Sequence, residues 1–319
     1  CRLVNSIPKE VTILDEANLT FLPKSIKNPV EVENERIAHI KDGVALTKFI
    51  CWLKKNVGKI PMTELSAGEK LYSFRAQQEN FIDNSFDPII SYGIHAAINH
   101  YSATPETDIA IEPGNFLLAD TGGHYYEGTT DTTRTIVMGS VNDEQKKYFT
   151  AVLRGMLNLG NAKFRYGCTG VNLDYLARGP LWEMGQDFNH GTGHGVGYLL
   201  NVHEGPNSFR WRIIQGDNAV LEEGMITSDE PGYYVENQYG IRHENLLVCK
   251  KAEKTSFGQF MCFEHLTMVP FDLDAVVPEL MTVQERALLN NYHAQVYKKI
   301  SPYLNIEEQE WLYEVCMEI

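Results

Sequence analysis

The spacing of apolar residues predicts helices from early in the chain. Asn28 precedes Pro29 and is followed three residues later by Glu31, the pattern of a capped helix start. Apolar residues then keep near-helical spacing, so we expect one buried face on a helix that ends near residue 55. The residues of that face are Ile37, Ile40, Val44, Phe49 and Leu53.

Other helix starts carry similar signals. Ser66 with Glu69 predicts a second helix, and Asn142 with Gln145 predicts a third. The pattern predicts that the third helix covers 142–159. Further helices are expected over roughly 171–184 and, as an amphipathic pair, over 281–319.

Segments with Gly-containing turns between these helices favour β-structure. They are 88–100, 114–139, 188–203, 224–249 and 259–270. Helices followed by a hairpin with two acidic residues occur before residue 139 and again after it. We therefore expect an α+β fold of two αββ halves around a pseudo-two-fold axis, with a site between them.

Charge and composition limit the partners. The 319 residues carry a formal net charge of −14 and no Lys/Arg-rich run, which argues against nucleic acid or an anionic membrane surface. No apolar stretch approaches the roughly 18–20 residues that span a bilayer. Six scattered cysteines without a CxxC pair are typical of reduced thiols in a cytoplasmic protein.

The beginning of the chain predicts a short strand and an extended linker over residues 1–25. The start CRLVNSIPKE has neither an initiator Met nor the apolar core of a signal peptide. We expect that residues upstream of Cys1 have been removed. No linker divides residues 26–319, which we expect to be a single catalytic domain.

The first hairpin, NFLLADTGGHYYEGTTDTTRTIVM, carries two aspartates. A turn centred between Tyr125 and Tyr126 would place Asp120 directly opposite Asp131, with both side chains on one face. Two bare carboxylates there would repel each other, so either one holds a proton or a cation lies between them. Taken alone, such a pair is more often a solvated turn.

The second hairpin, MITSDEPGYYVENQYGIRHENLLV, repeats the arrangement, because a turn at Asn237 makes Glu230 and Glu244 opposed partners. Between the hairpins, His194 stands between two glycines that let the backbone approach a site closely. A lone histidine of this kind is more often structural. Four carboxylates and one imidazole together form a set suited to two divalent ions such as Mn²⁺, Co²⁺ or Zn²⁺.

These residues lie in motifs that resemble the M24 metallopeptidases of the pita-bread fold, specifically the Xaa-Pro aminopeptidase (aminopeptidase P) family. The motifs are INHYSA, DTGGHYYEGTTDTTRT, HGTGHGVGYLLNVHEG, SDEPGYY and GIRHENLL. The resemblance covers about residues 26–319 and looks like the long, three-domain, cytosolic type. It implies hydrolysis of the bond between an N-terminal residue and a following proline.

The resemblance also implies roles for single residues. The metal ligands would be Asp120, Asp131, His194, Glu230 and Glu244. Of these, Asp131 and Glu244 would touch both metals, and Glu230 would be the general base. The metal that we expect is Mn²⁺. His100 and His203 would contact the substrate at the scissile bond, His190 would line the pocket for the residue after it, and Arg242 would orient the ligand carboxylates.

Two departures from the family pattern concern His243 and the length of the chain. His243 stands where relatives carry an aliphatic residue, and by alternation it should point away from the metals. Long family members have two upstream creatinase-like domains, and residues 1–25 would be a remnant of the second. Such members pair through the catalytic domain, which implies a homodimer. The alternatives are a prolidase-type Xaa-Pro dipeptidase, a methionine aminopeptidase, which these motifs fit poorly, and a non-catalytic binding module of the same fold.

Overall fold

The computed structural model describes residues 4–14, 18–216 and 218–319. Its α-helices are α1 (Phe21–Ser25), α2 (Pro29–Asn56), α3 (Glu64–Arg75), α4 (Asp143–Gly160), α5 (Tyr175–Trp182), α6 (Val283–Ile300) and α7 (Ile306–Val315). Short 3₁₀ helices are η1 (Val4–Ser6), η2 (Gly93–Ala97), η3 (Gly170–Asn172), η4 (Leu273–Ala275), η5 (Pro278–Leu280) and η6 (Ser301–Tyr303).

The strands lie mostly between the helices of the two halves. They are β1 (Phe81–Asn84), β2 (Ile89–Tyr92), β3 (Asn115–Thr121), β4 (Gly123–Tyr125), β5 (Gly128–Thr129), β6 (Thr132–Met138), β7 (Lys163–Arg165), β8 (Gly193–His194), β9 (Ser208–Phe209), β10 (Ile226–Asp229), β11 (Gly232–Val235), β12 (Tyr239–Arg242), β13 (Asn245–Thr255) and β14 (Gly258–His265).

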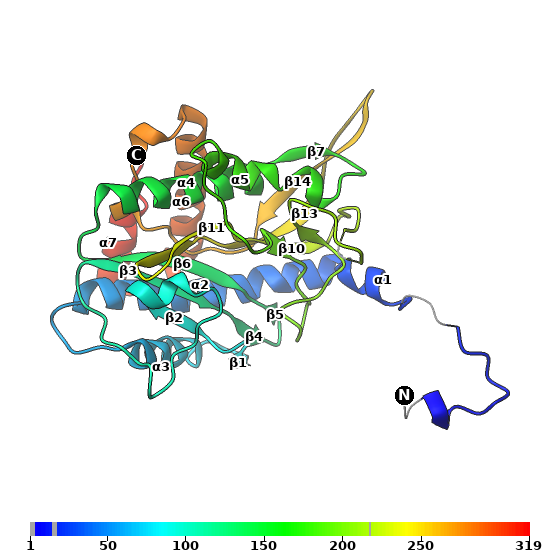
Figure 1. Ribbon diagram of the computed structural model, residues 1–319, viewed down its shortest axis with the longest axis horizontal. Coiled ribbons are helices and arrows are strands. Elements are labelled where there is room, and N and C mark those ends of the chain that lie inside the picture. The colour runs from blue at the N-terminus through cyan, green and yellow to red at the C-terminus, as the bar shows by residue number, and fades with distance from the viewer. Residues whose placement is uncertain (1–3, 15–17, 217) are drawn as a thin grey trace.

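The expected duplication is visible in how helices cover sheets. In the first half, α2 and α3 pack on a sheet of order β2-β3-β6, and in the second, α4 and α5 pack beside a sheet of order β10-β13-β14-β7. In Figure 1, β3, β6, β10 and β11 lie between α3 below and α4 and α5 above. The fold is α+β, as the sequence predicts.

An apolar core joins the two halves. Phe116 of β3 and Val137 of β6 belong to the same buried cluster as Phe149 of α4, Ile241 of β12 and Leu289 of α6. Burying a side chain of this size stabilises the fold by about 1.5–3 kcal/mol. The strands that carry the acidic residues are therefore held from both sides.

Helix starts follow the predicted caps at two of three positions. Asn28 and Asn142 cap α2 and α4, each with the predicted capping box. The start predicted at Ser66 is wrong, because Thr63 is the cap of α3 and Ser66 is its capping-box partner. One residue assigned to the buried face of α2, Ile37, is 41% exposed.

Three segments differ from the pattern. No strand occurs in the described part of 1–25, where η1 and α1 stand instead; residues 1–3 and 15–17 lie outside the described residues. The helix expected over 171–184 is divided into η3 and α5. The β-rich segment 188–203 contains β8 and then a loop, because Leu200 and Asn201 take left-handed backbone conformations that a strand excludes.

Two properties of the described residues concern membrane spans and cysteines. Among their helices, none combines the length and apolar character needed to span a bilayer. The cysteines in this part of the chain are all free thiols, as expected: Cys51, Cys168, Cys249, Cys262 and Cys316.

Candidate metal centre

A cavity of about 580 Å³ is lined by residues of both halves. It gathers positions that lie up to 158 residues apart in the sequence, between Phe86 and Glu244. Every residue that the sequence analysis singled out as a ligand or substrate contact lines this cavity: His100, Asp120, Asp131, His190, His194, His203, Glu230, Arg242 and Glu244.

The two aspartates come from the first hairpin, but their predicted register is wrong. The β3–β6 ladder pairs Asp120 with Thr133, not with Asp131. The tip of the hairpin lies beyond Tyr125, which pairs with Gly128, so the turn is displaced toward the C-terminus. Because side chains alternate along a strand, the two-residue error keeps Asp131 on the face of Asp120, as a diagonal neighbour.

The two glutamates come from the second hairpin, in the predicted register. The flanking ladders pair β11 with β12 and β10 with β13 around a turn at Asn237, and Glu230 and Glu244 lie between those ladders. A hydroxyl holds each carboxylate. Ser228 donates to Glu230 Oε1 at 3.0 Å, and Thr133 donates to Glu244 Oε2 at 2.7 Å.

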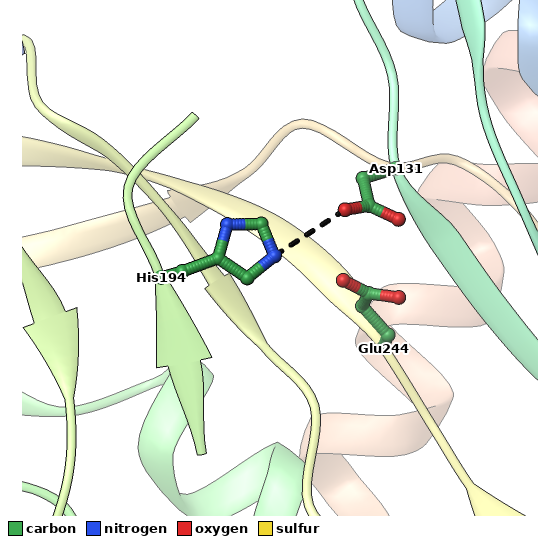
Figure 2. A group of neighbouring side chains, drawn as sticks. All are labelled: Asp131, His194 and Glu244. Atoms are coloured by element: carbon green, nitrogen blue, oxygen red, sulfur yellow. Dashed lines mark ion pairs between the residues drawn. The ribbon is translucent and has the colours of Figure 1, made fainter. Parts of the chain in front are cut away.

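His194 enters the cavity from the short strand β8. Its backbone N–H donates to Ser228 Oγ at 2.9 Å, and its ring Nδ1 lies 3.0 Å from the carbonyl of Gly195. In the neutral form, a ring whose Nδ1–H is bound to a carbonyl presents Nε2 as a free lone pair, as metal-binding histidines do. Nε2 points at Asp131, with Oδ2 3.4 Å away (Figure 2).

Three of these residues converge closely enough to share one ion. Ligand atoms of Asp131, His194 and Glu244 all lie within 4.8 Å of one another, and Figure 2 shows the three side chains directed at a common point. Asp120 and Glu230 line the same cavity but stand outside this closest group. Asp120 Oδ1 is buried and has no hydrogen-bond partner among the described residues.

The electrostatics of the cavity favour cations. Burial raises the pKa of Asp131 and of Glu244, and the neighbouring carboxylates raise both further. Burial also raises the pKa of Glu230, to about 7. At His194 burial lowers the pKa, but Asp131 and Glu230 outweigh it and the pKa rises to about 9. The raised pKa values of these three carboxyls mean that their anionic forms are destabilised in the cavity. Nearby positive charge would offset this, so the residues fit a pair of divalent ions.

Arg242 connects the acidic cluster to the predicted substrate pocket. Its guanidinium donates to Asp120 Oδ2 at 2.5 Å and to the hydroxyl of Tyr234 at 2.7 Å. The same hydroxyl lies 2.9 Å from His190 Nε2. Burial, and then the charge of Arg242, lower the pKa of His190 to about 3, so its ring is neutral at pH 7.

The two remaining histidines lie at the solvent-exposed mouth of the cavity. His203 packs its ring edge-on against His194, with ring centroids 4.2 Å apart. Partial burial, and then the charge of His194, lower the pKa of His203. His100 lies just after η2 on the first half. Both can donate hydrogen bonds to a group held in the cavity.

Comparison with known proteins decides the family. Residues 33–251 match the model of "Metallopeptidase family M24", and residues 259–319 match the "C-terminal region of peptidase_M24". The chain belongs to metallopeptidase family M24. The pita-bread fold predicted from the resemblance is confirmed by its structural neighbours.

Several relatives of this M24 chain are named for proline peptides. It is 43% identical over 296 residues to a "Probable Xaa-Pro aminopeptidase P" of Paracoccidioides brasiliensis, covering 91% of the chain and 48% of the relative. It is 38% identical over 334 residues to "Aminopeptidase P1" of Arabidopsis thaliana, covering 97% and 52%. The chain thus spans about half the length of these curated relatives.

Solved structures of the family resemble the chain to different degrees. The X-prolyl aminopeptidase of Caenorhabditis elegans, described as "a cytosolic enzyme with a di-nuclear active site", has a TM-score of 0.90 and 37% identity, covering 95% of this chain and 50% of that one. The Xaa-Pro dipeptidase of Bacillus anthracis has a TM-score of 0.65 and 29% identity, covering 81% and 66%.

Some residues that shape this M24 site were missed in the sequence. Ser228 and Thr133 hold the two glutamates, and Tyr234 joins His190 to Arg242. The signal for two of them was present, because Ser228 and Thr133 stand two residues from Glu230 and Asp131 in extended segments. Alternation places such neighbours on the same face.

His243 behaves as the alternation predicts. Its ring is buried away from the cavity, 4.3 Å from the ring of Phe149 and 5.6 Å from that of Phe271 between centroids. Burial, followed by the charge of Arg134, lowers its pKa to about 3. Neither ring nitrogen has a hydrogen-bond partner among the described residues. The ring therefore packs as part of the core.

Proposed function

We propose that this chain is the catalytic part of a metal-dependent aminopeptidase that removes an N-terminal residue from a following proline. The observation that carries the proposal is the convergence of Asp131, His194 and Glu244 in a cavity that also holds three further histidines. The names of the relatives support the substrate class.

Two divalent ions would be held by the four carboxylates and His194. We favour Mn²⁺, with Zn²⁺ and Co²⁺ as alternatives, since oxygen-rich sets with one imidazole accept all three. When bound, such ions lower the pKa of a water from 15.7 toward ~7 and polarise a carbonyl. The dinuclear site described for the Caenorhabditis elegans relative supports this assignment.

Glu230 would act as the general base. Its Oε1 is fixed by Ser228 at 3.0 Å and lies 3.5 Å from His194 Nε2. In this position Glu230 can take a proton from the attacking water and return it to the proline nitrogen that leaves.

The histidines would bind the substrate around the cleaved bond. His100 and His203 would donate hydrogen bonds to the carbonyl on which negative charge develops. His190, held neutral beside Tyr234, would line the pocket for the proline ring. Arg242 would keep Asp120 oriented, as residues behind a metal ligand generally do.

A dipeptidase acting on Xaa-Pro is the second candidate. The solved prolidase-type neighbours favour it, including the Bacillus anthracis enzyme. A non-catalytic binding module is a third reading, and it would have no need of the acidic cluster. By analogy with relatives, we further propose a cytoplasmic homodimer that pairs through this domain.

The deciding experiment compares Xaa-Pro-Xaa tripeptides with Xaa-Pro dipeptides, with and without Mn²⁺. We expect Mn²⁺-dependent release of the first residue from tripeptides and little cleavage of dipeptides. Cleavage of dipeptides alone would favour the prolidase. Metal uptake without any cleavage, by this chain and by a longer chain of the length of its relatives, would contradict the proposal.

A further inference from the structure

A segment near the start of the chain contacts the loop between His194 and His203. Residues 24–34, which we call the brace, run from the end of α1 into the first turns of α2. The brace contacts the loop near its beginning, along its course and at its end. None of these contacts belongs to the metal ligands themselves.

The loop needs support because its own conformation is unfavourable. Leu200 and Asn201 both have positive φ, 63° and 56°, which residues other than glycine rarely adopt. The chain closes on itself at two places, where Gly197 N–H donates to the Asn201 carbonyl and Glu204 N–H donates to the Gly195 carbonyl. The first bond closes the loop on itself, and the second joins the residue after His203 to the residue after His194.

Three side chains of the brace supply the outer contacts. Lys27 is 4% exposed, and its ammonium donates to the carbonyl of Val196 and, at 3.3 Å, to that of Ser25. Asn34 Nδ2 donates to the Tyr198 hydroxyl at 2.8 Å. Lys24 Nζ forms an ion pair with Glu204 Oε2 at 2.5 Å.

The brace is itself fixed to the body of the domain. Lys27 N–H donates to the carbonyl of Gly224 at 3.0 Å, and Ile26 bridges to Met225 just before β10. A Cβ at Gly224 would lie 2.3 Å from the Lys27 carbonyl oxygen, so the two backbones are in close contact. The ammonium of Lys27 therefore has a defined position relative to the strand next to the metal ligands.

We propose that Lys27 is a positioning residue for His203: through the Val196 carbonyl it holds the loop so that the His203 ring stays against His194. The inference rests on the proposed function for its kinetic readout. Burial lowers the pKa of Lys27, and the charges of Glu204 and Glu35 oppose this effect. Lys24 and Asn34 assist at the two flanks of the loop.

The test is a double-mutant cycle between Lys27→Met and His203→Ala, read as kcat, KM and bound metal. Lys27→Met should lower kcat about ten- to a hundredfold, since small misplacements of a catalytic group have effects of this size. KM and metal content should stay near the wild-type values. In the His203→Ala background the same substitution should have an effect below about twofold, because the two residues act as one unit.

A second measurement does not depend on turnover. Hydrogen exchange of the amides of residues 195–204 should be faster in Lys27→Met and in Asn34→Ala than in the wild type. Lys163→Met, which breaks only the exposed Lys163–Glu253 pair, is the matched control and should leave both readouts unchanged. Asn34→Ala serves if Lys27→Met does not fold.

The outcomes separate the two proposals. Equal loss of kcat in both backgrounds, or unchanged exchange of the loop, would overturn the positioning role. If the wild type cleaves no Xaa-Pro-Xaa peptide, the proposed function fails, and the exchange measurement alone then decides whether the brace holds the loop.

Discussion

Asp131 is the residue at which the contacts of the acidic cluster meet. It belongs to the closest group with His194 and Glu244, and it lies 3.4 Å from His194 Nε2. Its carboxylate carries the negative charge that would hold a cation there. A neutral amide of the same shape would keep the fold and lose the charge.

Asp131→Asn should therefore abolish turnover and reduce bound metal. His203→Ala is the contrasting variant, because His203 lies at the mouth and loses only a hydrogen-bond donor, a change that typically raises the barrier by about 3–4 kcal/mol. Metal analysis and peptide cleavage on both proteins check the pair. Wild-type turnover by a folded Asp131→Asn protein would refute the ligand assignment.

Arg242→Lys tests the link between the pocket and the cluster. A lysine cannot donate to Asp120 and to Tyr234 in the same fork geometry as the guanidinium. We expect about ten- to a hundredfold weaker metal binding, as for other residues that orient ligands. Competition with a metal chelator measures it. Unchanged affinity would mean that Asp120 needs no orienting partner.

For single residues, the sequence predicts which side chains belong to the site better than it predicts the hydrogen bonds between them. Alternation along the two hairpins places acidic residues on one face, and the structure has them there. The bond from Tyr234 to His190 spans 44 positions, and no local pattern encodes such a contact. No pattern in the sequence indicates that Asp120 Oδ1 has no hydrogen-bond partner among the described residues.

Strand β8 has little room beside β10. A Cβ at Gly193 would lie 1.8 Å from the carbonyl oxygen of Ser228 in β10. The strands approach this closely only because position 193 has no side chain, and the approach brings the His194 N–H to Ser228 Oγ. The location of His194 thus depends on its neighbour in sequence.

Gly193→Ala should push β8 away from β10 and reduce metal binding and activity. Gly68→Ala is the control, since its nearest neighbour is 3.7 Å from the new Cβ. Within a helix that substitution should stabilise the protein by about 0.5–1 kcal/mol. Urea unfolding and metal titration compare the two. If Gly193→Ala binds metal like the wild type, β8 is not restricted by packing.

Element prediction succeeds where the cause is local. The Asn28 and Asn142 boxes set the starts of α2 and α4 from three-residue patterns. The tight turn at Asn237, with φ 59°, sets the register of the second hairpin. The first hairpin turns beyond Tyr125 and its register was missed, because β4 and β5 extend the ladder past the acidic pair.

The whole molecule buries several neutral histidines far from the cavity. His293 is among them, in α6, where its Nε2 accepts a hydrogen bond from the Phe271 N–H at 3.1 Å. Burial, then the charge of Arg134, lower its pKa from 6.5 to about 3. The unfolded chain binds a proton there at a higher pH than the folded chain. His293 therefore stabilises the fold above pH 6.5, and that stability is lost as the pH falls toward 3.

Comparing the wild type with His293→Gln isolates this effect. The glutamine can still accept from Phe271 but does not titrate. The stability advantage of the wild type should shrink by about 1.4 kcal/mol for each pH unit below 6.5. Urea unfolding at several pH values measures the difference. A difference independent of pH would show that His293 titrates alike in both states.

The proposed metal centre depends on both halves of the molecule, because its ligands come from both hairpins and from the strand between them. The most direct test is calorimetric titration of the metal-free chain with Mn²⁺, repeated on Asp131→Asn and Glu244→Gln. Two ions should bind to each wild-type chain, and fewer than two to each variant. Absence of uptake by the wild type, or equal uptake by all three proteins, would contradict the proposed metal centre.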